Sequence, residues 1–329
     1  MTKCTKNFSK ISKFFFPVAI FAFIVLLLIS PAKYCAVALD GALVWATILL
    51  PSLFPFMFFS RLFTTFEVSG NLAKPFSKIT NKFYRCSHEC AYVFLLSLLC
   101  GYPIGAKLTS DLFLDGKISK GEANRSVAFV SNCGPMFIVG SVGVGMLGST
   151  KAGLVILVCH IFGSLINGFL YRNSWRNLDN VFMPSKFETK QETSVSDVVF
   201  SSINSVLMVG AYVIIFFIVA EVFSSLHFFS PISNLLNILG IETNLTEGFL
   251  SGLLEITKGA KCISMATTNL KIAAPLVCFV ITFGGFSTFM QSYSFLEKTG
   301  MKKSVLLLEK TTQAIFSTAL CVVVSQFVF

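Results

Sequence analysis

The stretch LLCGYPIGAK, residues 98–107, decides how this chain is expected to fold. It closes the apolar piece 91–103, which breaks at Gly101, Tyr102 and Pro103 and is followed by Lys107. A helix that crosses a bilayer needs about 20 predominantly apolar residues, so this piece is too short to cross. Unsatisfied backbone groups are costly in hydrocarbon, and a break at membrane depth must be buried in protein or face a water-filled cavity. The stretch therefore predicts one side of an internal site.

The composition of the whole chain is that of a polytopic membrane protein. Of its 329 residues, 54% are hydrophobic and only 13% are charged, against roughly 25% charged residues in a soluble domain. The net charge is +10, and the basic residues lie in short loops between apolar runs. A role in membrane orientation explains this placement better than nucleic-acid binding does. The ten cysteines have no disulfide-like spacing, and they are expected to be small buried side chains.

Seven full crossings and two shorter pieces account for the apolar runs. The crossings are predicted at about 14–30, 41–63, 126–147, 152–171, 198–223, 272–295 and 305–327. The short pieces, 91–103 and 246–257, are predicted to be re-entrant half-helices. The first crossing follows a lysine-rich segment, and we favour a retained span over a cleaved signal peptide for residues 1–38, an alternative that stays open.

The basic residues favour one orientation of these crossings. With the lysine-rich N-terminus in the cytoplasm, the inner loops hold most Lys and Arg, while the outer segment 227–245 has none, in agreement with the positive-inside rule. The C-terminus is then expected outside. The inner residues are Lys3, Lys6, Lys10, Lys13, Arg61, Lys74, Lys78, Lys82, Arg85, Arg172, Arg176, Lys186, Lys190, Lys298, Lys302, Lys303 and Lys310.

The two short pieces also mark an internal repeat. LLCGYPIGAK is followed by VAFVSNCGPMF (127–137), and LLEITKGAK (253–261) is followed by VCFVITFGGFS (277–287). Each copy contains three full crossings, an odd number, so the second copy must enter the membrane from the opposite side. An inverted repeat with discontinuous helices is typical of secondary transporters. The predicted units are an N-terminal membrane helix (1–40), a first repeat (41–171), a cytoplasmic linker (172–197) and a second repeat (198–329).

Five motifs in a fixed order carry a resemblance to a known family. They are PSLFPF (51–56), GYPIGAKLTSDL (101–112), EANRSVAFVSNCGPMFIVGSVGVGM (122–146), FLSGLLEITKGA (249–260) and FGGFS (283–287). With them the chain resembles the sporulation integral membrane proteins of the YlbJ type, which carry paired nucleoside-recognition, or Gate, domains. The resemblance implies an all-α fold similar to concentrative nucleoside transporters. It also implies transport of the dicarboxylate dipicolinic acid across the outer forespore membrane during endospore formation.

Other functions stay open beside this one. A nucleoside permease is a variant of the transport hypothesis, and a non-transporting scaffold or gate subunit of a sporulation complex is an alternative of another class. An enzyme is not expected, because the sequence offers neither a credible catalytic nucleophile with a general base nor a set of metal ligands. CSHEC (86–90) has too few ligands for a closed zinc site, and no metal or cofactor is predicted.

The expected partners follow from the same hypothesis. They are a small dipicolinate-like anion, the lipid bilayer and a coupling ion, H+ or Na+. Nucleic acid is not among them, and a homo-oligomer is left open. The protein is expected to be a multi-pass protein of the cell membrane or the outer forespore membrane of a spore-forming bacterium.

Two lysines at equivalent repeat positions are candidates for contact with an anion. Lys107 and Lys261 each come two residues after a glycine, and a charge near the midplane is usually functional. The alternative is that each lysine extends to the membrane interface from the end of a short helix. Both interpretations stay open for this pair.

The interrupted spans supply the other candidates for substrate binding. A break at Gly134 or Gly284 would start a new half-helix, whose N-terminal N–H groups and positive dipole end favour an anion. Close packing of small residues between helices is the alternative. The predicted substrate-binding residues are Gly101, Tyr102, Pro103, Gly105, Lys107, Ser131, Asn132, Gly134, Lys261, Gly284, Gly285, Ser287 and Gln291.

One acidic residue is a candidate for coupling or gating. Glu255 is the only acid in FLSGLLEITKGA, and intramembrane acids commonly pair with a base or carry a coupling proton. It is expected to pair with Lys258 or Lys261, and a purely structural ion pair is the alternative. Glu221 and His160 are weaker candidates, since both can serve in helix packing.

Overall fold

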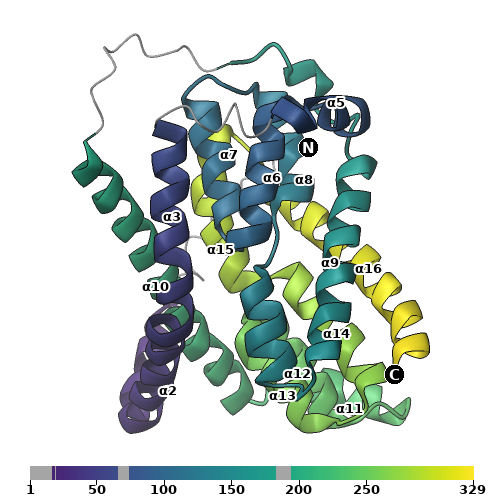
Figure 1. Ribbon diagram of the computed structural model, residues 1–329. Coiled ribbons are helices and arrows are strands. Elements are labelled where there is room, and N and C mark those ends of the chain that lie inside the picture. Colours follow the sequence, from purple (N-terminus) through teal and green to yellow (C-terminus); the bar gives the residue numbers. More distant parts are fainter. Residues whose placement is uncertain (1–16, 19, 66–73, 183–193) are drawn as a thin grey trace, which may run out of the picture.

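Helices make up all the regular structure in the part of the chain that the structure describes. The computed structural model describes residues 17, 18, 20–65, 74–182 and 194–329, and every element in them is helical (Figure 1). Four helices are long and apolar enough to cross a membrane, and a bent pair of helices would make a fifth. The four are Thr150–Leu170, Val195–Ser225, Leu270–Thr299 and Lys303–Val328. An all-α polytopic fold is thereby confirmed, although not the seven separate crossings.

The N-terminal region differs from the two crossings predicted there. Helix Ile20–Ile29 meets the next helix at an angle of 105°. From Pro31 the chain is helical to Thr65, through α2 (Pro31–Val44), the π-helical η1 (Trp45–Leu49) and α3 (Leu50–Thr65). The predicted crossing 41–63 thus begins about ten residues earlier than expected. The lysines before residue 14, and residues 14–16 and 19 of the predicted crossing 14–30, lie outside the described residues.

The long helix α10 (Val195–Ser225) packs along α2 and α3 at one side of the molecule. The Trp45 indole lies over Gly210, where a Cβ would come within 2.6 Å of the ring, and its Nε1 donates a hydrogen bond to the Val206 carbonyl at 3.1 Å. We call α2, η1, α3 and α10 the scaffold helices. They form one wall beside the rest of the fold.

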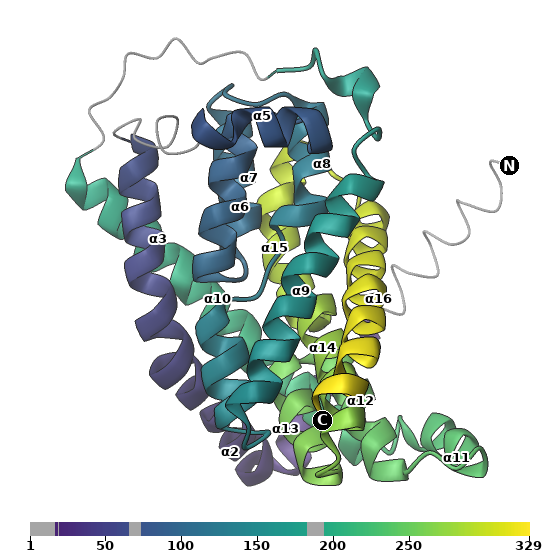
Figure 2. The same ribbon diagram turned by 45° about the vertical axis from the view of Figure 1, so that its right-hand side comes forward.

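Two helical hairpins lie at opposite ends of the molecule (Figures 1 and 2). Hairpin 1 consists of α6 (His88–Cys100) and α7 (Ile104–Leu114), on the side of α5 (Ser77–Ile79). Hairpin 2 consists of α12 (Thr243–Leu254) and α13 (Ile256–Ala266), on the side of α11 (Ser230–Ile238). The two short apolar pieces are therefore the first arms of hairpins that turn back to the side from which they come.

Each hairpin is followed by a broken helix and then by an unbroken one. Broken helix 1 consists of α8 (Lys120–Val130) and the π-helical η4 (Met136–Val144), and broken helix 2 consists of α14 (Leu270–Phe283) and α15 (Gly285–Leu296). The unbroken helices are α9 (Thr150–Leu170) and α16 (Lys303–Val328), which pack against each other where Gly163 meets Ser317. The predicted crossing 126–147 is thus two helices, because residues 131–134 leave helical geometry.

Most of the basic segments lie at the end of the molecule that carries α5. This end holds η2 (Lys74–Phe76), η3 (Thr80–Tyr84), η5 (Arg176–Leu178) and η6 (Glu297–Thr299). Lys310, counted above among the inner basic residues, lies inside α16 and is only 3% exposed. Lys186 and Lys190 lie outside the described residues.

Candidate functional site

The tips of both hairpins, the break of broken helix 1 and the N-terminal part of α15 border one cavity of about 450 Å³. Hairpin 1 contributes Gly101 and Tyr102, and hairpin 2 contributes Glu255. The tips sit on the breaks of their own halves. A Cβ at Gly101, where φ is +79°, would lie 2.6 Å from the Gly134 nitrogen, and a Cβ at Gly285 would lie 3.1 Å from the Leu254 carbonyl oxygen. Glycine at these positions lets backbone meet backbone.

The cavity has an apolar wall and a polar wall. The scaffold helices contribute only apolar residues, Leu49, Leu53, Val209 and Val213, and hairpin 1, η4 and α13 add Leu99, Met136, Phe137 and Ile256. The polar wall comes from the hairpin tips and from the N-terminal parts of α13 and α15, with Tyr102, Glu255, Thr257, Ser287, Thr288 and Gln291. Such a cavity can hold a small molecule with an apolar ring against one side and hydrogen-bonding groups toward the other.

Glu255 is the one charged residue among the described residues that line the cavity. It is 2% exposed and caps α13, accepting a hydrogen bond from the Lys258 backbone N–H at 2.7 Å. The expected ion pair with Lys258 or Lys261 is not formed. The Lys258 ammonium turns away to Glu221 at 2.6 Å, and Lys261 is exposed.

Behind the cavity, a buried lysine connects the two halves. The Lys310 Nζ donates to the Tyr102 hydroxyl at 2.5 Å and to the Ser131 carbonyl at 3.2 Å, and it lies 4.2 Å from the centre of the Tyr102 ring. The Tyr102 hydroxyl in turn donates to the Thr282 carbonyl at 2.9 Å. The tip of hairpin 1 is thus bonded to a carbonyl just before the break in broken helix 2.

A buried histidine pairs a further group of the broken backbone. His160 on α9 has no exposed surface, and its Nε2 accepts a hydrogen bond from the Cys133 N–H at 3.0 Å. Its Nδ1 lies 2.9 Å from the Thr282 hydroxyl. Backbone groups that a break sets free are costly unless they are paired. Lys310, Tyr102 and His160 pair them here with side chains from other elements.

Two ion-pair clusters connect the hairpins to the scaffold helices at opposite ends. At the α5 end, Asp111 of hairpin 1 lies 3.1 Å from Arg61 on α3 and 3.2 Å from Lys107. At the α11 end, Glu221 on α10 lies 2.6 Å from Lys258 of hairpin 2 and 2.9 Å from Lys33 on α2. We call these clusters latch 1 and latch 2. Both hairpins are held against the scaffold in this conformation.

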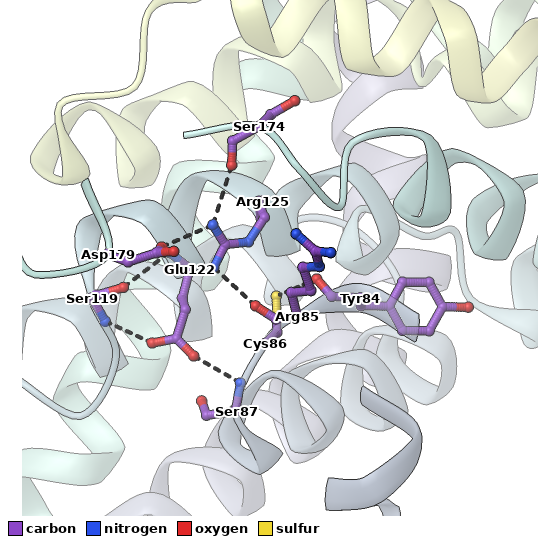
Figure 3. Close-up of polar contacts among 9 residues, drawn as sticks. All are labelled: Tyr84, Arg85, Cys86, Ser87, Ser119, Glu122, Arg125, Ser174 and Asp179. Carbon is purple, nitrogen blue, oxygen red and sulfur yellow. Dashed lines mark hydrogen bonds and ion pairs between the residues drawn. The ribbon is translucent and has the colours of Figure 1, made fainter. Parts of the chain in front are cut away.

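Hairpin 1 is also fixed at its base by a polar cluster around Arg125 and Glu122 (Figure 3). The Arg125 guanidinium donates to the Arg85 carbonyl at 2.9 Å and pairs with Asp179 at 2.8 Å. The Glu122 carboxylate accepts from the Ser87 N–H at 2.7 Å, just before α6 begins. The start of hairpin 1, the start of α8 and the turn after α9 therefore form one fixed unit, from which the tip extends to the cavity.

The structure brings some of the predicted site residues to the cavity and places others elsewhere. Those that line it are Gly101, Tyr102, Gly134, Glu255, Ser287 and Gln291. Those that do not are Pro103, Gly105, Lys107, Ser131, Asn132, Lys258, Lys261, Gly284 and Gly285. In this second group, Ser131 and Asn132 act behind the cavity, where Lys310 and Gln313 contact them. Lys107 and Lys258 belong to the latches.

Sequence reasoning missed Lys310 and the scaffold wall. Lys310 lies within the predicted crossing 305–327, and a charge inside a crossing is a signal of function, so the sequence did contain the evidence. The scaffold residues gave no such signal, because Leu49, Leu53, Val209 and Val213 are ordinary apolar residues of a span. Within the described ranges, no group of three or more His, Cys, Asp or Glu side chains could hold a metal ion.

The fold and the cavity define a multi-pass helical membrane protein with a central site built from interrupted helices. The chain is a homologue of the sporulation integral membrane protein YlbJ of Bacillus subtilis (strain 168). The two are 27% identical over 339 aligned residues, which cover 94% of this chain and 82% of that protein. No family model matches the chain, and no solved structure matches it.

The contact between Lys310 and Tyr102 can be tested by a double-mutant cycle. We expect Tyr102→Phe and Lys310→Met each to destabilise the protein, because each leaves a buried polar group unpaired. Their combined effect should fall short of the sum by about 0.5–3 kcal/mol, since the two groups share one network. Unfolding of the purified protein in detergent measures these changes.

Tyr212→Phe on α10 is the matched control for this cycle. Its hydroxyl makes no hydrogen bond to any residue that the structure describes, so its removal should leave stability unchanged. Strict additivity of Tyr102→Phe and Lys310→Met would show that the contact does not contribute.

Proposed function

We propose that the protein is a secondary transporter that moves a small anionic aromatic metabolite, dipicolinic acid first among them, across the membrane. The observation that carries the proposal is the convergence of two hairpin tips, the break of broken helix 1 and the start of α15 on one cavity. The sporulation role is carried over from the homologue, which is named a sporulation integral membrane protein. The protein acts in this proposal as a carrier and not as an enzyme.

An inverted repeat is part of the proposal, and the order of the elements supports it. In both halves a long helix is followed by a hairpin, a broken helix and an unbroken helix. His160 comes 26 residues after Gly134, and Lys310 comes 26 residues after Gly284. These two buried residues, at equivalent positions, both contact backbone at the first break. The hairpins lie at opposite ends of the molecule, as a repeat inverted in the membrane requires.

Backbone donors at the cavity suit an anion. The helical segments α7, η4, α13 and α15 all begin at or beside it, and their first N–H groups have no helical partner. The preceding helices α6, α8, α12 and α14 end there too, and the roughly −0.5 charge of each C-terminus offsets the roughly +0.5 charge of the N-terminus that follows. The charge at the cavity therefore depends on Glu255. An ionised Glu255 would repel a dianion, so in this proposal Glu255 holds a proton when the anion binds, which makes it a coupling residue.

The two latches supply a gating device for alternating access. Each joins one hairpin to the scaffold at one end of the molecule, so release of latch 1 or latch 2 would free hairpin 1 or hairpin 2. In many transporters one repeat or bundle moves against the other around a fixed site. With both latches formed, this conformation corresponds to a closed state between the two open ones.

A nucleoside is a second candidate substrate, and one observation favours it. The described residues that line the cavity include no Lys or Arg, while Thr, Ser, Gln and Glu side chains are present. Such groups suit a neutral ring with several hydrogen-bonding positions. Transport assays can separate the two substrates directly.

Uptake into vesicles tests the proposed function. We expect vesicles that contain the protein to take up dipicolinate above empty vesicles, and Gln291→Ala to weaken uptake about tenfold or more through the loss of one buried polar contact. Glu255→Gln should remove the pH dependence of uptake, because the amide cannot exchange a proton.

Lys261→Ala is the control for these variants, since Lys261 is exposed on the same hairpin as Glu255. Uptake of uridine but not of dipicolinate would show that the substrate is a nucleoside and not the anion. Uptake of neither, by a folded protein, would contradict transport and favour the scaffold alternative.

Hydrogen exchange tests the latches separately. We expect Asp111→Asn to speed amide exchange in hairpin 1 and Glu221→Gln to speed it in hairpin 2, each by up to about fivefold, since a partly exposed ion pair is worth about 1 kcal/mol or less. Mass spectrometry of peptides from both hairpins measures the change. Equal effects of either variant on both hairpins would show that the clusters do not hold them independently.

A further inference from the structure

Glu309 is a buried acid that the proposed mechanism does not use. It lies on α16, is 1% exposed, and neither carboxylate oxygen has a hydrogen-bond partner among the described residues. An ionised carboxylate without partners is very costly in an apolar interior, and such a group takes up a proton instead. The geometry therefore favours the neutral acid.

The groups nearest to Glu309 along its own helix and on α9 do not compensate a negative charge. Lys310 follows it directly, but adjacent residues of a helix do not face each other, and the Lys310 ammonium goes to Tyr102 and Ser131. Asn167 on α9 donates to the Glu309 backbone carbonyl at 3.1 Å and not to the carboxylate. Tyr171, directly after α9, has its hydroxyl 3.3 Å from the Thr312 hydroxyl.

The described residues of the other helices packed against α16 place no cation in contact with the Glu309 carboxylate. On α8, Arg125 is paired with Asp179, and Lys120 lies at the start of the helix beside Gly300. On α9, Lys151 donates to the Val328 carbonyl, and His160 is engaged with Cys133 and Thr282. The one charged residue of α14 is Lys271, at the start of that helix. α15 contains no charged residue. Among the described charged groups, Lys310 is therefore the one that a charge on Glu309 would influence most.

We propose that Glu309 is a proton-binding site that controls the charge behind the cavity. When its carboxyl group is protonated, the Lys310 ammonium is uncompensated and adds positive potential behind Tyr102, which lines the cavity. When Glu309 releases the proton, its carboxylate offsets that charge. Since charges interact strongly in a low-dielectric interior, binding of an anion and binding of the proton favour each other, and linkage makes this reciprocal.

Infrared difference spectroscopy of the purified protein tests the proton site without any substrate. We expect the wild type to show a carboxylic-acid C=O band that shifts in D₂O, and we expect Glu309→Gln to lose a component of that band. Glu221→Gln is the matched control, because Glu221 is paired with two lysines and is ionised. Glu309→Asp should keep the component at a shifted frequency, which covers the case in which the amide variant does not fold.

A second measurement concerns the connection to the cavity, and this part rests on the proposed function. Dipicolinate binding by the wild type should weaken as pH rises, and Glu309→Gln should remove part of that dependence while it retains binding. Identical infrared spectra of wild type and Glu309→Gln would overturn the proton site. A lost infrared component with no binding of dipicolinate by the wild type would leave the proton site standing and contradict the substrate instead.

Discussion

The structure depends on the pairing of backbone groups that the breaks leave without helical partners. In a membrane interior these groups cannot turn to water, and each would cost several kcal/mol if left unpaired. The Lys310 ammonium, the Tyr102 hydroxyl and the His160 ring pair them with hydrogen bonds of 2.9–3.2 Å. These bonds come from hairpin 1, α9 and α16. Interrupted helices are therefore stable here only because distant parts of the chain meet at the breaks.

The site follows from this arrangement. Once the hairpin tips lie on the breaks, several helix N-termini point at a common space, and the scaffold helices close it with apolar side chains. The polar residues of the cavity all belong to the hairpins and broken helices, whereas the scaffold helices contribute only apolar ones, and a latch joins the two groups of elements at each end. Relative movement of the two groups would change access to the cavity without disturbing the polar wall. This division makes a carrier the function that the geometry supports best.

The sequence predicted the breaks well because their signals are local. Gly101 to Pro103 and the glycines at 134 and 284 interrupt apolar runs of the sequence, and helices of the structure end at these positions. The partners of the breaks could not be predicted in this way. The expected partner of Lys258 was Glu255, three residues before it in the sequence. Lys258 instead pairs with Glu221 on α10, because a partner on another helix can compete with one on the same helix. The cavity wall of Leu and Val residues from the scaffold depends on how helices pack, which a single sequence does not specify.

The central claim is that the two hairpins approach one cavity from opposite faces of the membrane. The exposed residues Asp115, after hairpin 1, and Thr268, after hairpin 2, mark the two faces. Each is changed to cysteine in a chain in which Cys4, Cys35 and Cys262 are serine, and each is labelled with a membrane-impermeant thiol reagent in vesicles of known orientation. We expect one face to label only Asp115→Cys and the other only Thr268→Cys. Labelling of both positions from the same face would contradict the account.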